Sequence, residues 1–79
     1  MADAEWTYKE LLWQDPDRVS GALCFYGTRV PVEILFANLE GGESLERFLV
    51  NYPSVSREQA VETIELSRVG LLKLVGLAA

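Results

Sequence analysis

Histidine is absent from this sequence of 79 residues, and cysteine occurs once, as Cys24. Without an imidazole, the chain has no Ser-His-Asp or Cys-His arrangement and no histidine general base. A single thiol forms no disulfide within the chain, and most zinc sites need several thiolate or imidazole ligands. The carboxylates are scattered rather than grouped in a motif. The sequence therefore predicts no metal, no cofactor and no catalytic residues, and we expect a protein that is not an enzyme.

Phosphate-binding glycine motifs and an excess of positive charge are also lacking. The glycines are isolated or paired at expected turns, so neither GxxxxGK[ST] nor GxGxxG occurs. Seven basic residues stand against 12 acidic ones, which gives a net charge of -5. A net negative charge does not suit a protein that binds nucleic acid without a partner. A partner with a basic surface is the better expectation.

No apolar run is long enough to span a membrane. The most apolar segment, LLKLVGLAA at 71–79, is far shorter than the ~20 residues that a transmembrane helix needs. We also see no signal peptide in residues 1–10, and therefore expect a cytoplasmic protein without a membrane anchor.

Apolar material is abundant for so short a chain, since 49% of the residues are hydrophobic. A single domain of this size buries only roughly 60% of the surface that its unfolded chain exposes. We therefore expect one domain over residues 1–79 that associates with itself, most simply as a homodimer.

The order of apolar runs and turn formers predicts a short β-hairpin followed by three helices. A two-stranded ribbon is expected from residues 6–13 and 22–27, which flank a segment rich in turn formers. Pro31 suits the first position of a helix, and the glycines at 41–42 are expected to end that helix. Ser44 is expected to cap a second helix that stops near Asn51, before Pro53. A capping box at 56–59 opens the third helix, and these lengths are typical of a mainly α, helix-turn-helix bundle.

The spacing of apolar residues predicts which side of each helix is buried. The expected inward-facing residues are Ile34, Leu35, Ala37 and Leu39 in the first helix, Leu45, Phe48 and Leu49 in the second, and Ala60, Val61, Ile64 and the stem of Arg68 in the third. Cys24, in the apolar run before the first helix, is expected to act as a small buried hydrophobe.

Four strings in order carry a resemblance to a known family: DP at 15–16, SGALCFYGTRVPV at 20–32, GGES at 41–44 and NYPSVSREQAVETI at 51–64. Over about residues 11–68 the chain resembles domain-of-unknown-function family 433, whose pattern leaves 69–79 as an extra apolar segment. The resemblance implies a β-hairpin and a three-helix, homeodomain-like core. It also implies a VapB-like antitoxin that acts beside a PIN-like ribonuclease toxin, and it supplies no catalytic residues.

Candidate contacts fall into two groups. Arg29, in the GTR string, is able to bind a phosphate or an acidic partner, or else to tie the hairpin to a helix end or to Glu33. A dimer that gathers its arginines would make a DNA surface, although three glutamates on the third helix oppose this. The candidate partner or nucleic-acid contacts are therefore Arg29, Arg47, Arg57 and Arg68.

The second group is the apolar C-terminal segment, whose candidate seam residues are Leu71, Leu72, Leu74 and Val75. Three interpretations are open: the segment completes the core, forms a dimer seam, or lies in a groove of another protein. We expect an antitoxin-like interaction protein that neutralises a ribonuclease toxin. The alternative is a dimeric, DNA-binding helix-turn-helix regulator.

Overall fold

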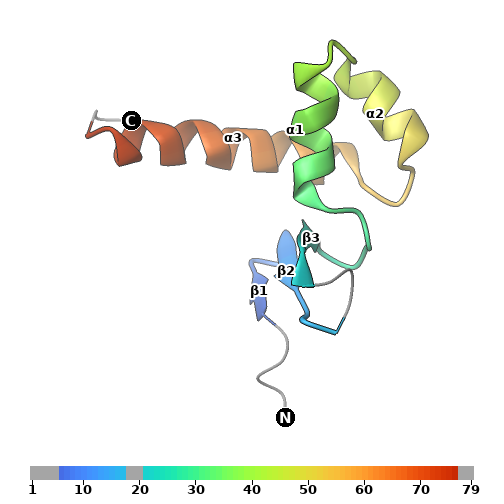
Figure 1. Ribbon diagram of the computed structural model, residues 1–79, viewed down its shortest axis with the longest axis horizontal. Helices are drawn as coiled ribbons and strands as arrows, with labels where there is room; N and C mark the ends of the chain where they lie inside the picture. Colours follow the sequence, from blue (N-terminus) through green and yellow to red (C-terminus); the bar gives the residue numbers. More distant parts are fainter. Residues whose placement is uncertain (1–5, 18–20, 77–79) are drawn as a thin grey trace.

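A small sheet and three helices make up the computed structural model, which describes residues 6–17 and 21–76 (Figure 1). The strands are β1 (Trp6–Tyr8), β2 (Leu12–Gln14) and β3 (Leu23–Phe25). The helices are α1 (Val32–Glu40), α2 (Leu45–Asn51) and α3 (Arg57–Leu74). The three predicted helices are confirmed. The fold is nevertheless mixed α/β rather than mainly α, because the N-terminal part forms a sheet.

The sheet has three antiparallel strands in the order β1-β2-β3, so the predicted two-stranded ribbon is wrong in the number of strands. Tyr8 pairs with Leu12, which in turn pairs with Phe25. The extra strand arises because the chain folds back at Lys9 and Glu10, whose φ angles are 53° and 54°. Residues other than glycine, asparagine and aspartate seldom adopt positive φ, so nothing in the sequence marked this turn.

The core joins the sheet to all three helices. Phe25 of β3, Leu35 of α1 and Phe48 of α2 are completely buried. The ring centroids of Phe25 and Phe48 lie 6.2 Å apart, within the range of favourable aromatic contacts. The other buried hydrophobic residues among those described are Leu11, Leu12, Cys24, Val32, Val55 and Ala60. Only the first turns of α3 contribute to this core.

Apart from the end of α3, the predicted helix boundaries hold to within one residue. The Ser44 hydroxyl accepts a hydrogen bond from the Arg47 backbone N–H at 3.1 Å, and Ser56 and Gln59 form the predicted capping box. Pro31 is the residue just before α1 rather than its first residue. At the other end of α1, Gly42 takes the positive φ of 96° that ends the helix.

The buried side of α3 differs from the prediction. Val61 and Arg68 are exposed, whereas Thr63, which sequence analysis did not select, is 3% exposed. Ala60 and Thr63 lie three residues apart on one side, and that side faces the body. Ala37 of α1 is likewise exposed. Threonine has nearly the same shape as valine, so Thr63 fills a buried position that a search for apolar residues alone passes over.

α3 also runs past Gly70 to Leu74, through the point where we expected a separate segment. Its second half extends away from the sheet and from the other helices (Figure 1). Residues 77–79 of the predicted C-terminal segment lie outside the described residues. Among the helices that the structure describes, none combines the length and the apolarity needed to cross a bilayer.

The GTR string forms the joint between β3 and α1. The buried Thr28 hydroxyl donates a hydrogen bond to the Phe25 carbonyl at 2.9 Å and accepts one from the Val30 N–H at 3.0 Å. The indole Nε1 of Trp13 donates to the Thr28 carbonyl at 2.8 Å. Thr28 thus holds the sheet, the turn and the start of α1 in one arrangement.

Thr28→Val is expected to destabilise the domain by about 1–3 kcal/mol, because the change leaves the Val30 N–H without its acceptor in a buried position. Urea unfolding followed by circular dichroism measures this loss. Thr7→Val, at an exposed position of β1, is the matched control and should change stability by less than about 0.5 kcal/mol. Equal effects of the two substitutions would show that the Thr28 hydroxyl contributes nothing.

Candidate interaction surface

Two of the four candidate arginines are neutralised by glutamates. Arg57 of α3 pairs with Glu46 of α2, and Arg68 makes two hydrogen bonds with Glu65, at 3.1 and 2.6 Å. The hydrogen bond from Arg57 lowers the pKa of Glu46. The hydrogen bonds from Arg68 likewise lower the pKa of Glu65, and Glu65 raises the pKa of Arg68. Neither arginine therefore presents an unopposed positive charge to a nucleic acid.

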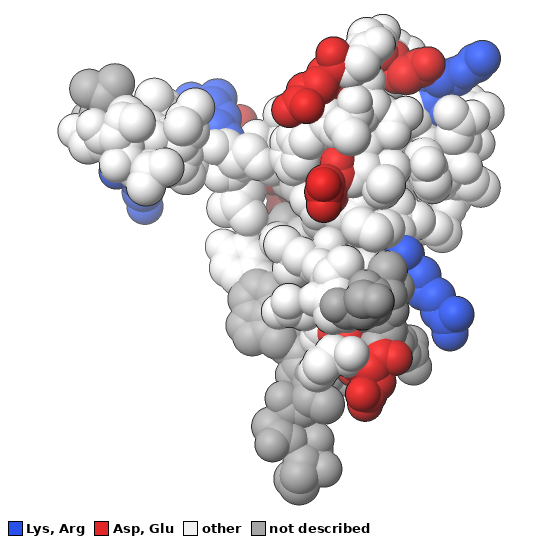
Figure 2. Space-filling view, viewed as in Figure 1, with Lys and Arg blue, Asp and Glu red and all other residues white. Residues whose placement is uncertain are grey.

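The other two arginines are exposed on separate elements. Arg29 lies between β3 and α1, and Arg47 lies in α2. Within residues 6–17 and 21–76, the side chain of neither makes a hydrogen bond or ion pair, so the expected tie from Arg29 to Glu33 is not formed. Basic side chains lie as separate spots on the face shown in Figure 2, and acidic ones lie over the α1 side and also near the sheet. On that face the basic side chains do not gather into a patch.

The end of α3 and the residue after it bring together three strongly exposed apolar side chains. Leu74 is 81% exposed, Leu71 60% and Val75 59%. We call these three residues the outer apolar patch. Leu72, the fourth predicted seam residue, is half-buried. The interpretation that this segment completes the core is wrong, because the helix carries the patch beyond the body. A dimer seam and a docking helix remain.

The outer apolar patch extends the inward side of α3. Leu71 and Leu74 follow Ala60 and Thr63 at the three- and four-residue steps that keep side chains on one side of a helix. Near the body that side is buried against the core, and beyond the body nothing in the described chain covers it. This side of the helix is therefore buried in its first half, and after Ser67 its second half carries exposed leucines.

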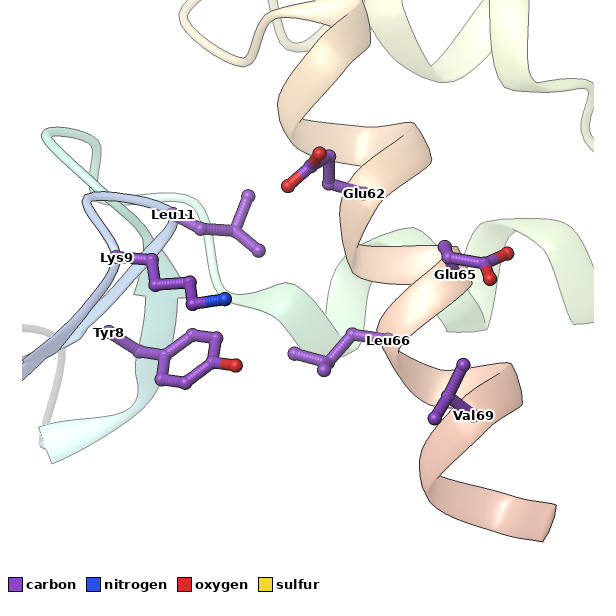
Figure 3. A pocket seen from close by; sticks show the side chains of 7 residues that line it. All are labelled: Tyr8, Lys9, Leu11, Glu62, Glu65, Leu66 and Val69. Carbon is purple, nitrogen blue, oxygen red and sulfur yellow. The ribbon is translucent and has the colours of Figure 1, made fainter. Parts of the chain in front are cut away.

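A groove lies between another side of α3 and the β1–β2 turn (Figure 3). Its volume is about 200 Å³. Side chains from the turn and from the helix face each other across it, and the Lys9 ammonium lies 5.6 Å from the centre of the Tyr8 ring. The lining residues are Tyr8, Lys9, Leu11, Glu62, Glu65, Leu66 and Val69.

Sequence analysis did not find this groove. Its near wall exists only because the chain folds back at Lys9 and Glu10 to form β1 and β2. The wall formed by α3 could be predicted in part, because Leu66 and Val69 follow Glu62 at a helical spacing. The signal that was missing is therefore the position of the turn.

Cys24 is buried, as predicted, and its thiol lies 3.6 Å from the Ala22 carbonyl. Burial raises the pKa of this thiol above its ordinary value, which keeps it in the unreactive neutral form. Among the residues that the structure describes, no three cysteine or carboxylate side chains are grouped closely enough to hold a metal ion. The features that stand out are surfaces suited to binding: the outer apolar patch and the groove.

A family model described as "Protein of unknown function (DUF433)" matches residues 13–65 of the chain. The match covers most of β2, all of β3, α1 and α2, and the first half of α3, and it stops before Leu66 and the outer apolar patch. No curated protein and no solved structure matches the chain. The matched segment is more than half of the sequence, and the chain therefore belongs to the DUF433 family.

Proposed function

We propose that this chain is a non-enzymatic, cytoplasmic interaction protein, the antitoxin-like component of a toxin-antitoxin pair. Its partner would be a PIN-like ribonuclease whose active cleft it covers. The observation that carries the proposal is the outer apolar patch on the projecting half of α3. Soluble monomers seldom leave such residues together in water, and grouped exposure of this kind marks contact sites.

The patch has the form of a docking helix. Leu71, Leu74 and Val75 follow the three- and four-residue spacing with which an amphipathic helix fills a groove on another protein. Full burial of a leucine or valine side chain is worth about 1.5–3 kcal/mol. Three such residues would supply a large part of the free energy of a specific complex, once the cost of association is met.

The net negative charge of the chain supports a partner with a basic surface. The net charge is -5, and two of the arginines are already paired with glutamates. An enzyme that cleaves RNA needs positive potential around its cleft, and an acidic protein is drawn to that potential. The outer apolar patch would then provide the affinity of the complex. The acidic surface would increase the rate of association and orient the two proteins.

A DNA-binding helix-turn-helix regulator is the second candidate, and one feature favours it. A short turn at residues 52–56 joins α2 to α3, as in helix-turn-helix and homeodomain-like proteins. The pairing of Arg57 and Arg68 weakens this candidate, because DNA affinity depends mainly on phosphate contacts from unpaired basic side chains. We expect no salt-dependent gel shift from the chain alone. A steep fall in DNA affinity with rising salt would favour the regulator.

Native mass spectrometry of the tagged chain, purified gently from its native host, tests the main proposal. We expect a second protein in fixed ratio to the chain, with ribonuclease activity that appears when the complex is dissociated. A partner without ribonuclease activity, or only copies of the chain itself, would contradict the antitoxin function.

A further inference from the structure

The groove beside α3 is the second uncovered surface of the molecule, and it is separate from the outer apolar patch. Its apolar walls are formed by Leu66 and Val69 of α3 and by Leu11 in the turn before β2. Glu62 and Glu65 also line the side formed by α3. Figure 3 shows Leu66 directed toward the turn that carries Tyr8 and Lys9. The groove is open along α3, so an elongated segment fits it better than a small molecule.

A stripe along α3 continues the groove toward the C-terminus. Leu66, Val69 and Leu72 follow one another at steps of three residues, and Lys73 lies one residue beyond. Helices that pair side by side use this three- and four-residue spacing. The stripe is centred on Val69, with acidic residues before the centre and a basic residue after it.

We propose that a second copy of this chain occupies the groove, through an antiparallel pairing of the two α3 helices about a two-fold axis at Val69. In this pairing Val69 faces Val69 of the second copy, and Leu66 faces Leu72 of the second copy. A two-fold axis forms each contact twice, so one short stripe on each copy builds the whole seam. The proposal does not depend on the ribonuclease partner.

Charge selects the antiparallel direction. About the axis at Val69, Glu65, which also accepts hydrogen bonds from Arg68 of its own helix, lies beside Lys73 of the second copy, and the reverse contact forms by symmetry. A parallel pair would instead bring Lys73 next to Lys73 and Glu65 next to Glu65, which are repulsive contacts. The register that pairs the apolar residues is therefore the register that pairs opposite charges.

The β1–β2 turn adds a further contact. The C-terminal end of the second α3 would lie beside Glu62 and Leu66, and thus next to Lys9 across the groove. The last carbonyls of a helix have no intrahelical donors and carry partial negative charge. Lys9 is placed to neutralise that end, and Tyr8 and Leu11 to cover Leu72 of the second copy.

The pairing leaves the outer apolar patch uncovered. Leu71 and Leu74 lie on the side of α3 that continues from Ala60 and Thr63, whereas Leu66 and Val69 lie on the groove side. One dimer would therefore present two outer apolar patches. Self-association and partner binding can be separated by substitution, because they use different sides of one helix.

Cysteine cross-linking of the purified chain tests the proposed axis. Val69→Cys brings two thiols together at the axis, so mild oxidation is expected to give disulfide-linked dimers at least roughly ten times faster than for Leu74→Cys, the control on the outer patch. The wild type, whose Cys24 is buried, sets the background. Faster cross-linking through Leu74→Cys, or equal rates for the two variants, would overturn the proposal.

A charge exchange tests the register by sedimentation equilibrium. K73E places carboxylates side by side at both ends of the seam, and we expect the dimer dissociation constant to rise roughly tenfold. E65K combined with K73E restores opposite charges across the seam, although it breaks the Arg68–Glu65 pair within each helix, and should return the constant toward the wild-type value. A wild-type chain that stays monomeric at every soluble concentration, or a double variant as weak as K73E, would refute the seam.

Discussion

Phe48→Ala is expected to remove most of the domain's stability. Phe48 of α2 is completely buried, and its ring lies 6.2 Å from that of Phe25 and 5.0 Å from that of Tyr52. Removal of a buried phenylalanine ring costs about 3–5 kcal/mol. Small domains have stabilities near the lower end of the usual range of about 5–15 kcal/mol. Far-ultraviolet circular dichroism and urea unfolding measure the loss directly.

Val50→Ala in the same helix is the matched control. Val50 is 72% exposed, so its truncation should change the free energy of unfolding by less than about 0.5 kcal/mol. A cooperative transition for Phe48→Ala within about 1 kcal/mol of the wild type would mean that the sheet and the helices do not share the core described above.

Leu74→Glu is expected to weaken binding of the protein partner by roughly 30-fold or more, because central apolar contacts often contribute about 2 kcal/mol or more to a complex. Leu74 is 81% exposed in the unbound chain, so the substitution should leave the fold and its stability unchanged. Titration of the purified variant against the partner by isothermal calorimetry gives the dissociation constant.

Val50→Glu adds the same charge at another exposed apolar position, on α2, and should bind the partner within about threefold of the wild type. Equal losses for the two variants would indicate that added negative charge weakens binding in general. Unchanged binding by Leu74→Glu would remove the outer apolar patch from the interface.

The helices could be predicted from the sequence because their boundaries depend on local chemistry. Ser44 and the Ser56 capping box satisfy backbone donors within one turn, and Gly42 supplies the conformation that ends α1. The third strand could not be predicted, because Lys9 and Glu10 adopt positive φ without the residues that favour it. Only tertiary contacts of the sheet explain that turn.

The candidate surface could also be predicted only in part, because the exposure of a side chain depends on tertiary structure. The apolar character of Leu71, Leu74 and Val75 is visible in the sequence, but their exposure depends on how far α3 extends beyond the body. The ion pairs of the arginines could not be predicted from the sequence. Their number was known, yet the pairs Arg57 with Glu46 and Arg68 with Glu65 appear only when the helices are placed.

Hydrogen–deuterium exchange of the chain with and without its partner tests the central claim most directly, namely that the projecting half of α3 is the contact surface. At concentrations where the chain alone is monomeric, the amides of residues 70–76 should exchange quickly, because this end of the helix packs against nothing in the described body of the same copy. In the complex we expect strong protection of these residues and little change in α1 and α2. Protection confined to α1 and α2, with residues 70–76 unchanged, would contradict the account.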